Sequence, residues 1–197
     1  MPSANNPTLQ YDITHSVWAH NYDIAVHGSH VIHVDNSSLT PGKPDLTFHS
    51  GPNSHAQVVG VCKFEHFSTG TKIGLGDPKQ PSKMIYEKML KDGIMSPRYS
   101  FRVNIGGYSR HLTWKKTHSM GTGPSGNFKL VDDTSQRVLA VFSSASAFSF
   151  KTGNIALYVD HGEPFRLMTL MTGIAVRESL RRRRSSSAAA GGGGGGA

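Results

Sequence analysis

The sequence has little cysteine and little charge, and each shortage excludes a class of protein. Cys62 is the single cysteine among 197 residues, so the chain can form neither an internal disulfide framework nor a zinc site built on several cysteines. Only 17% of the residues are charged, which excludes a coiled coil and a chain kept disordered by its own charge. The length suits one domain of ordinary size or one domain with tails.

Targeting signals and long apolar runs are also missing. Residues 1–10 lack a basic start followed by an apolar stretch, so we expect no secretory signal, and we see no motif for a lipid anchor. The most apolar segment is residues 165–176, shorter than the roughly 20 residues that cross a bilayer. We therefore expect a cytoplasmic protein without a transmembrane segment, with peripheral membrane association and a nuclear location left open.

Acidic residues are outnumbered, and much of the basic excess is local. The formal net charge is +8, with 21 Lys and Arg against 13 Asp and Glu. Half of that excess comes from four consecutive arginines at 181–184, and only Ser, Ala and Gly follow them. We predict a disordered tail over 185–197, a disordered N-terminal segment over 1–14, and one domain over 15–184.

The body of the domain has the pattern of many short strands. Turn signals separate segments rich in β-branched and aromatic residues, several of which alternate with a period of two. Gly106 and Gly107 predict a two-residue hairpin turn, and residues 133–136 predict another. Strands are predicted at 30–34, 45–49, 56–64, 71–75, 83–88, 100–105, 108–115, 127–131, 137–143 and 154–159. This number of strands with short links indicates an antiparallel barrel or sandwich.

Residues 163–180 break the strand pattern and predict the one helix. Glu163 and Pro164 suit a first helical turn, and the arginines suit its end. Apolar side chains lie all round the helical wheel, which is typical of a helix buried in a core or in a membrane. Because the run is short for a membrane span, we predict a core helix. The predicted fold class is therefore all-β with one helix.

The final helix and three other segments carry a resemblance to a known family. They are residues 108–116, with Trp114, Lys115 and Lys116, the run 121–132, and the strand 138–142. Over roughly residues 15–184 the chain resembles the tubby C-terminal-like superfamily, which includes tubby domains, phospholipid scramblases and LURP-one-related proteins. It is most similar to small fungal members. The resemblance implies a closed antiparallel β-barrel around a central hydrophobic C-terminal helix.

Patterns that suggest chemistry have simpler explanations. Residues 121–126 match G-x-G-x-x-G, but a strand pattern follows them and Pro124 removes an amide, so we predict a turn. Cys62 lies in an apolar run and is predicted to be a buried thiol. The 11 histidines show no metal-ligand spacing and are predicted on the surface and in turns. We predict no enzyme activity, no cofactor and no metal site.

Basic residues remain as the candidate site. In the predicted hairpin they would bind an anionic headgroup, and Arg181, Arg182, Arg183 and Arg184 would form a polybasic tail. The alternatives are a solvated outer face for the hairpin, and a nuclear-localisation-like signal or a helix-end charge for the arginines. The hairpin candidates are Arg98, Arg102, Arg110, Lys115 and Lys116.

The leading functional hypothesis is a non-enzymatic intracellular domain that binds anionic phospholipid or phosphoinositide headgroups. It rests on the basic excess and on analogy of fold. The alternative hypothesis is a protein-interaction or regulatory scaffold without lipid binding, and nucleic-acid binding ranks behind both.

Overall fold

The computed structural model describes residues 6–16, 20–37, 40–65, 69–93, 96–117, 127–144 and 151–191, without the side chains of 127, 151, 152 and 185–191. The predicted turn at 121–126 and residues 192–197 of the predicted tail lie outside these ranges.

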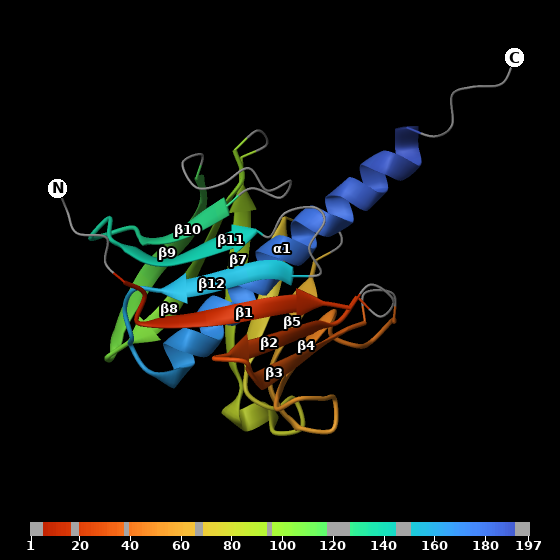
Figure 1. Cartoon of the computed structure of the whole chain (residues 1–197), viewed down its shortest axis with the longest axis horizontal. Coiled ribbons are helices and arrows are strands. Elements are labelled where there is room, and N and C mark those ends of the chain that lie inside the picture. The colour runs from red at the N-terminus through yellow and green to blue at the C-terminus, as the bar shows by residue number, and fades with distance from the viewer. Residues whose placement is uncertain are drawn as a thin grey trace, which may run out of the picture.

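The described residues form a closed barrel of twelve antiparallel strands and one α-helix (Figure 1). Strands that follow each other in sequence are paired, and β1 also pairs with β12, which closes the barrel. The elements are β1 (Leu9–His15), β2 (Tyr22–Val26), β3 (Ser29–Asn36), β4 (Leu46–Ser50), β5 (Gln57–Phe64), β6 (Gly70–Leu75), η1 (Pro81–Lys83), β7 (Ile85–Asp92), β8 (Arg98–Ile105), β9 (Tyr108–Thr117), β10 (Asn127–Asp132), β11 (Val138–Ser144), β12 (Lys151–Leu157) and α1 (Glu163–Gly191).

The structure confirms the predicted fold class and adds two strands at the N-terminus. β1 begins at Leu9, so the prediction of disorder was wrong for residues 9–14, which form the barrel seam with β12. Tyr11 and Ile13 point inward, and the residues that alternate with them are polar. The composition of the segment therefore resembles that of a polar tail, although every second side chain is apolar. β2 is a five-residue strand of the same kind.

The hairpin between β8 and β9 shows how the local sequence sets the register. Inward-facing Tyr99, Phe101 and Val103 alternate with exposed positions along β8. Gly106 and Gly107 have φ values of +58° and +83°, the left-handed values that a tight turn between two paired strands needs. The predicted two-residue turn is therefore confirmed, as is the turn after Asp132.

The helix α1 passes through the middle of the barrel and leaves it at the far end (Figure 1). Its apolar residues are among the most buried of the chain, at 1% exposure or less, which confirms the predicted core helix. They are Phe165, Met168, Leu170, Met171, Ile174, Ala175 and Val176. The helix continues to Gly191, beyond the predicted end at 180, so residues 185–191 are helical and not part of a disordered tail. No helix in the described ranges is long and apolar enough to cross a membrane.

Close contacts on α1 fix its position against the strands. The indole Nε1 of Trp114 donates a hydrogen bond of 3.0 Å to Thr172 Oγ1, which satisfies the one polar group of this buried ring. A Cβ on Gly173 would lie 2.7 Å from Ile155 Cδ1, so the absent side chain lets α1 approach β12 closely.

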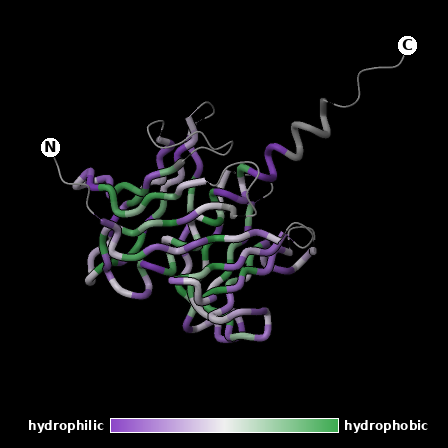
Figure 2. Tube along the Cα trace, in the orientation of Figure 1, coloured by the Kyte–Doolittle hydropathy of each residue, from purple (hydrophilic) through white to green (hydrophobic). Residues whose placement is uncertain are grey.

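The two ends of the barrel differ, and each is named by its relation to α1. The entry mouth is the end at which the helix begins, marked by Leu9, Ser50 and Glu163. The exit mouth is the end at which it leaves, marked by Phe64 and Lys91. The residues of α1 are themselves hydrophilic where the helix emerges from the exit mouth (Figure 2).

The substitution Ile174→Asp tests whether α1 is the core of the fold. Ile174 is fully buried, so an aspartate there would be an unpaired charge in an apolar interior. We expect Ile174→Asp to abolish the cooperative urea transition followed by circular dichroism. The matched variant Ile174→Val should fold and lose about 1 kcal/mol. If Ile174→Asp were as stable as Ile174→Val, the buried position of α1 would be refuted.

Candidate functional site

The five predicted hairpin residues do not converge on one surface. Arg98, Arg102 and Lys115 face outward on β8 and β9, and Arg98 is paired directly with Lys115. Arg110 and Lys116 have the inward orientation, but they lie near opposite ends of β9. The hairpin therefore offers a pair of outward cations near the exit mouth, not a five-residue site.

Acidic side chains neutralise much of the hairpin. Arg110 Nη1 lies 2.8 Å from Asp132 Oδ2, and Lys115 Nζ lies 3.3 Å from Asp133 Oδ1. His111 Nδ1 is 2.6 Å from Asp133 Oδ2 as well. Burial raises the pKa of both carboxyl groups, but the hydrogen bonds they accept outweigh it, so each pKa is below its ordinary value. Arg98, Arg102 and Lys116 have no carboxylate partner within the described part of the chain.

The four arginines of the predicted polybasic tail differ in burial. Arg181 and Arg182 are held against the exit mouth by Glu178, whose side chain is fully buried. Arg181 Nε and Arg182 Nε donate hydrogen bonds of 2.7 and 2.8 Å to the Glu178 carboxylate, and the Tyr22 hydroxyl donates one of 2.8 Å. The first two arginines are thus structural, whereas Arg183 and Arg184 are exposed.

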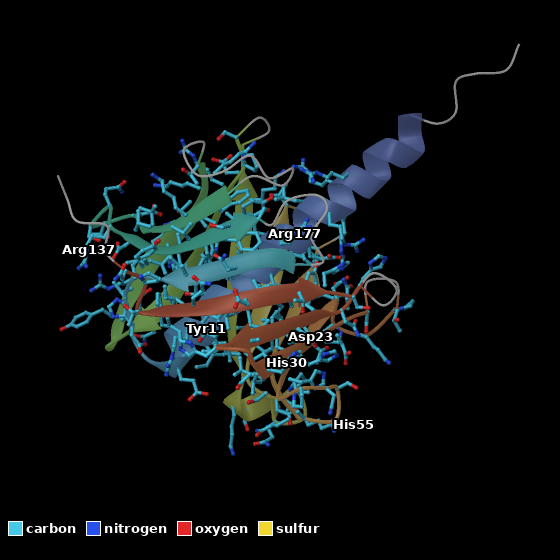
Figure 3. All side chains as sticks on the ribbon, viewed as in Figure 1. Tyr11, Asp23, His30, His55, Arg137 and Arg177 are labelled. Carbon is cyan, nitrogen blue, oxygen red and sulfur yellow. The ribbon has the colours of Figure 1, made fainter. Side chains whose placement is uncertain are left out.

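Arg182 ties the helix to a second buried carboxylate. Its Nη1 lies 2.9 Å from Asp45 Oδ1, and its guanidinium carbon lies 4.3 Å from the centre of the Phe64 ring. Asp45 also accepts a hydrogen bond of 3.0 Å from the amide of Phe64. These contacts join α1 to strands β4 and β5 at the exit mouth. Figure 3 labels Arg177, which lies on α1 five residues before Arg182 and so shows where this part of the helix lies.

Protonation of Glu178 should disrupt this network. Burial would raise its pKa, but the hydrogen bonds from Arg181, Arg182 and Tyr22 lower it to about 2. A carboxyl group with a lowered pKa contributes its stability above the ordinary value of 4.5, and that contribution is lost as the pH falls from there to about 2.

Comparison of Glu178→Gln with the wild type tests the network. At pH 7 we expect the free energy of unfolding of the variant to be about 3 kcal/mol below that of the wild type. This difference should shrink steadily as the pH falls from 4.5 to 2. Urea unfolding at a series of pH values measures this, with Glu87→Gln on β7 as the matched control. A pH-independent difference would contradict the proposed role of the charge.

A hollow of about 210 Å³ opens at the exit mouth beside the arginine network. Lys91 from β7 and Arg183 from α1 supply two cationic side chains to its wall. Thr71, Tyr99 and Ser179 supply hydroxyl groups from β6, β8 and α1. Two cations among several hydroxyl donors form an arrangement that suits a phosphate group.

The electrostatics of the hollow favour an added anion. Burial and the nearby charge of Arg183 both lower the pKa of Lys91. The Tyr99 hydroxyl is buried without a hydrogen bond of good geometry to the described residues, although Ser179 lies near enough to affect its pKa. Glu65 also lines the hollow, but its carboxylate is 2.8 Å from Lys88 Nζ.

The sequence analysis missed Lys91, Tyr99, Thr71 and Ser179. Three of them are the last inward-facing positions of their strands at one end of the barrel, and Ser179 lies on α1 at the same level. The period-two pattern could have marked Lys91 as an inward cation, because Met89 faces inward on the same strand. Nothing local shows that three strands and a helix meet there.

Two histidines predicted on the surface are instead part of a polar cluster on β2, β3 and β4. His33 Nδ1 lies 2.6 Å from Asp23 Oδ1, and His33 Nε2 lies 3.2 Å from Asp35 Oδ1. His49 Nε2 lies 3.1 Å from the other oxygen of Asp35. Within the described ranges, no group of side chains has the arrangement of a metal site.

Cys62 is fully buried in the barrel wall, as predicted. Burial, with the nearby carboxylate of Asp45, raises the pKa of its thiol far above the ordinary value. We expect no reaction with Ellman's reagent in the native protein at pH 8 and one equivalent in denaturant. Fast labelling of the native state would show that the thiol is accessible.

Comparison with known proteins gives no further assignment. No protein-family model matches the chain, no curated protein matches it, and no solved structure matches it.

Proposed function

We propose that the protein is a non-enzymatic module that binds anionic phospholipid headgroups, phosphoinositides included, at the exit mouth. The observation that carries the proposal is the hollow in which Lys91 and Arg183 lie beside the buried Tyr99 hydroxyl. A phosphate placed there would lie between two cations and would relieve their mutual repulsion.

The surroundings of the hollow support an approach by a membrane surface. Lys116 lies at the rim of the exit mouth, and Arg98 and Lys115 lie on the adjacent outer face. The buried acids at this end, Glu178 and Asp45, already have arginine partners, so their charge is compensated. A polybasic surface of this kind gains about 1 kcal/mol per cation near an anionic membrane.

Membership of the tubby C-terminal-like superfamily is part of the same proposal. The closed barrel around a C-terminal helix is the architecture that the resemblance implies, and it supports the assignment on architecture alone. The exit-mouth site does not depend on that assignment, because it is argued from side chains of this chain.

Co-sedimentation with vesicles tests the proposed site. At physiological salt we expect binding to phosphatidylcholine vesicles that contain a phosphoinositide and none to phosphatidylcholine alone. The double variant Lys91→Gln/Arg183→Gln should lose about 2 kcal/mol, roughly thirtyfold in affinity.

The matched control also removes two positive charges, but at the entry mouth. Lys79 and Lys83 lie around η1 at that end, so Lys79→Gln/Lys83→Gln should bind nearly as the wild type does. Equal losses in the two double variants would show that net charge alone drives binding. Absence of vesicle binding, or tighter binding to DNA than to vesicles, would overturn the proposal.

A further inference from the structure

The entry mouth contains a second hollow, of about 340 Å³, at the other end of the barrel from the proposed headgroup site. It lies between the first turns of α1 and strands β1 to β5. Tyr11, which Figure 3 labels, is one of its walls. Its volume falls within the range of pockets that bind small molecules.

The hollow exists because α1 does not fill the barrel evenly. The backbone of α1 runs near those of β5, β6 and β8 over more residues than near those of the other strands. A barrel of about eight strands is already filled by its own side chains, whereas a wider one encloses additional space. Twelve strands around one helix therefore leave room between the first turns of α1 and strands β1 to β5.

The walls of the hollow are apolar side chains that the protein leaves partly uncovered. Of the ten partly buried hydrophobic residues that pack against the described core, six line this one hollow. They are Leu9, Val26, Val31, Ile32, Val59 and Leu167. An aliphatic chain in the hollow would remove their remaining apolar surface from water, which is the favourable term in such binding.

Arg166 places a charge at the rim of these apolar walls. It forms an ion pair with Asp160, and because its Nε lies 3.7 Å from Asp160 Oδ1, beyond hydrogen-bond distance, a ligand in the hollow would compete with Asp160 for the guanidinium. Burial raises the pKa of the Tyr11 phenol, the charge of Arg166 opposes that shift, and the charges of Asp160 and Glu163 add to it, so all three charged groups lie near Tyr11. Glu163 lines the hollow too, so an anionic ligand group would need its contact with Arg166 to outweigh the repulsion from this carboxylate.

We propose that the entry hollow binds a medium-chain fatty carboxylate, with its chain on the six apolar residues and its carboxylate on Arg166. The fork of an arginine guanidinium matches a carboxylate in two parallel hydrogen bonds. A cavity of about 150 Å³ accommodates benzene, so this volume suits a chain of about eight to twelve carbons. The site is separate from the exit mouth and does not require the headgroup function.

Isothermal titration calorimetry of the full chain with decanoate and with decanol tests both halves of the proposal. We expect decanoate to bind one-to-one and decanol to bind more weakly at the same site. Arg166→Gln should lower the affinity for decanoate at least tenfold and change the affinity for decanol by less than twofold. Equal affinity for the two ligands, or an Arg166→Gln variant that binds decanoate normally, would overturn the carboxylate assignment.

Two variants that fill the hollow test its location. Val31→Phe on β3 and Leu167→Phe on α1 each place a larger side chain into the space, and each should reduce binding of both ligands at least tenfold. Two positions on different elements keep the test valid if one variant misfolds, which the thermal transition reveals. Unchanged binding in a folded filling variant, or no binding by the wild type, would overturn the site.

Vesicle sedimentation separates this proposal from the previous one. The filling variants should bind phosphoinositide vesicles as the wild type does, because Lys91 and Arg183 lie at the opposite mouth. Loss of vesicle binding in a folded filling variant would contradict the independence of the two sites.

Discussion

Burial of the apolar surface of α1 inside the closed barrel is the interaction on which the rest of the structure depends. Between Phe165 and Val176 the helix buries apolar side chains on all its sides, so no single sheet face could cover it. The barrel needs the helix in turn, because inward side chains such as Trp114 and Phe101 have α1 as the centre of their core. The hydrogen bond from Trp114 to Thr172 adds a polar contact within this apolar core and fixes the depth of the helix.

The electrostatics of the exit mouth follow from that depth. Glu178 lies on α1 at the level where the barrel ends, so its charge is taken out of water and must be compensated. Arg181 and Arg182, three and four residues later, are on the same side of the helix and reach back to it. Ser179 and Arg183, which are also four residues apart, lie on another side of the helix and line the hollow with Lys91. The candidate anion site is therefore a consequence of where the helix leaves the barrel.

Sequence patterns predicted the helix, the strands and the turns better than they predicted which residues come together in space. The apolar run of α1, the Gly106-Gly107 turn and ten strands could be predicted because each is encoded within a few neighbouring residues. β1 was missed because its polar outward positions masked the alternation of its inward ones. The convergence of Lys91 and Tyr99 with Arg183 depends on strand register and helix depth, which are set by contacts far apart in the chain.

The two mouths of the barrel differ chemically because α1 itself changes along its length. Its first turns place Leu167 and Leu170 in the hollow beside β1 to β5, where apolar side chains of the barrel wall remain partly uncovered. Its later turns carry the arginines, of which Arg182 pairs with Glu178 of the same helix and with Asp45 beside β4. Between the two ends lie fully buried side chains that include Met171 and Ile174. One helix in one barrel thus produces an apolar hollow at one end and a cationic hollow at the other.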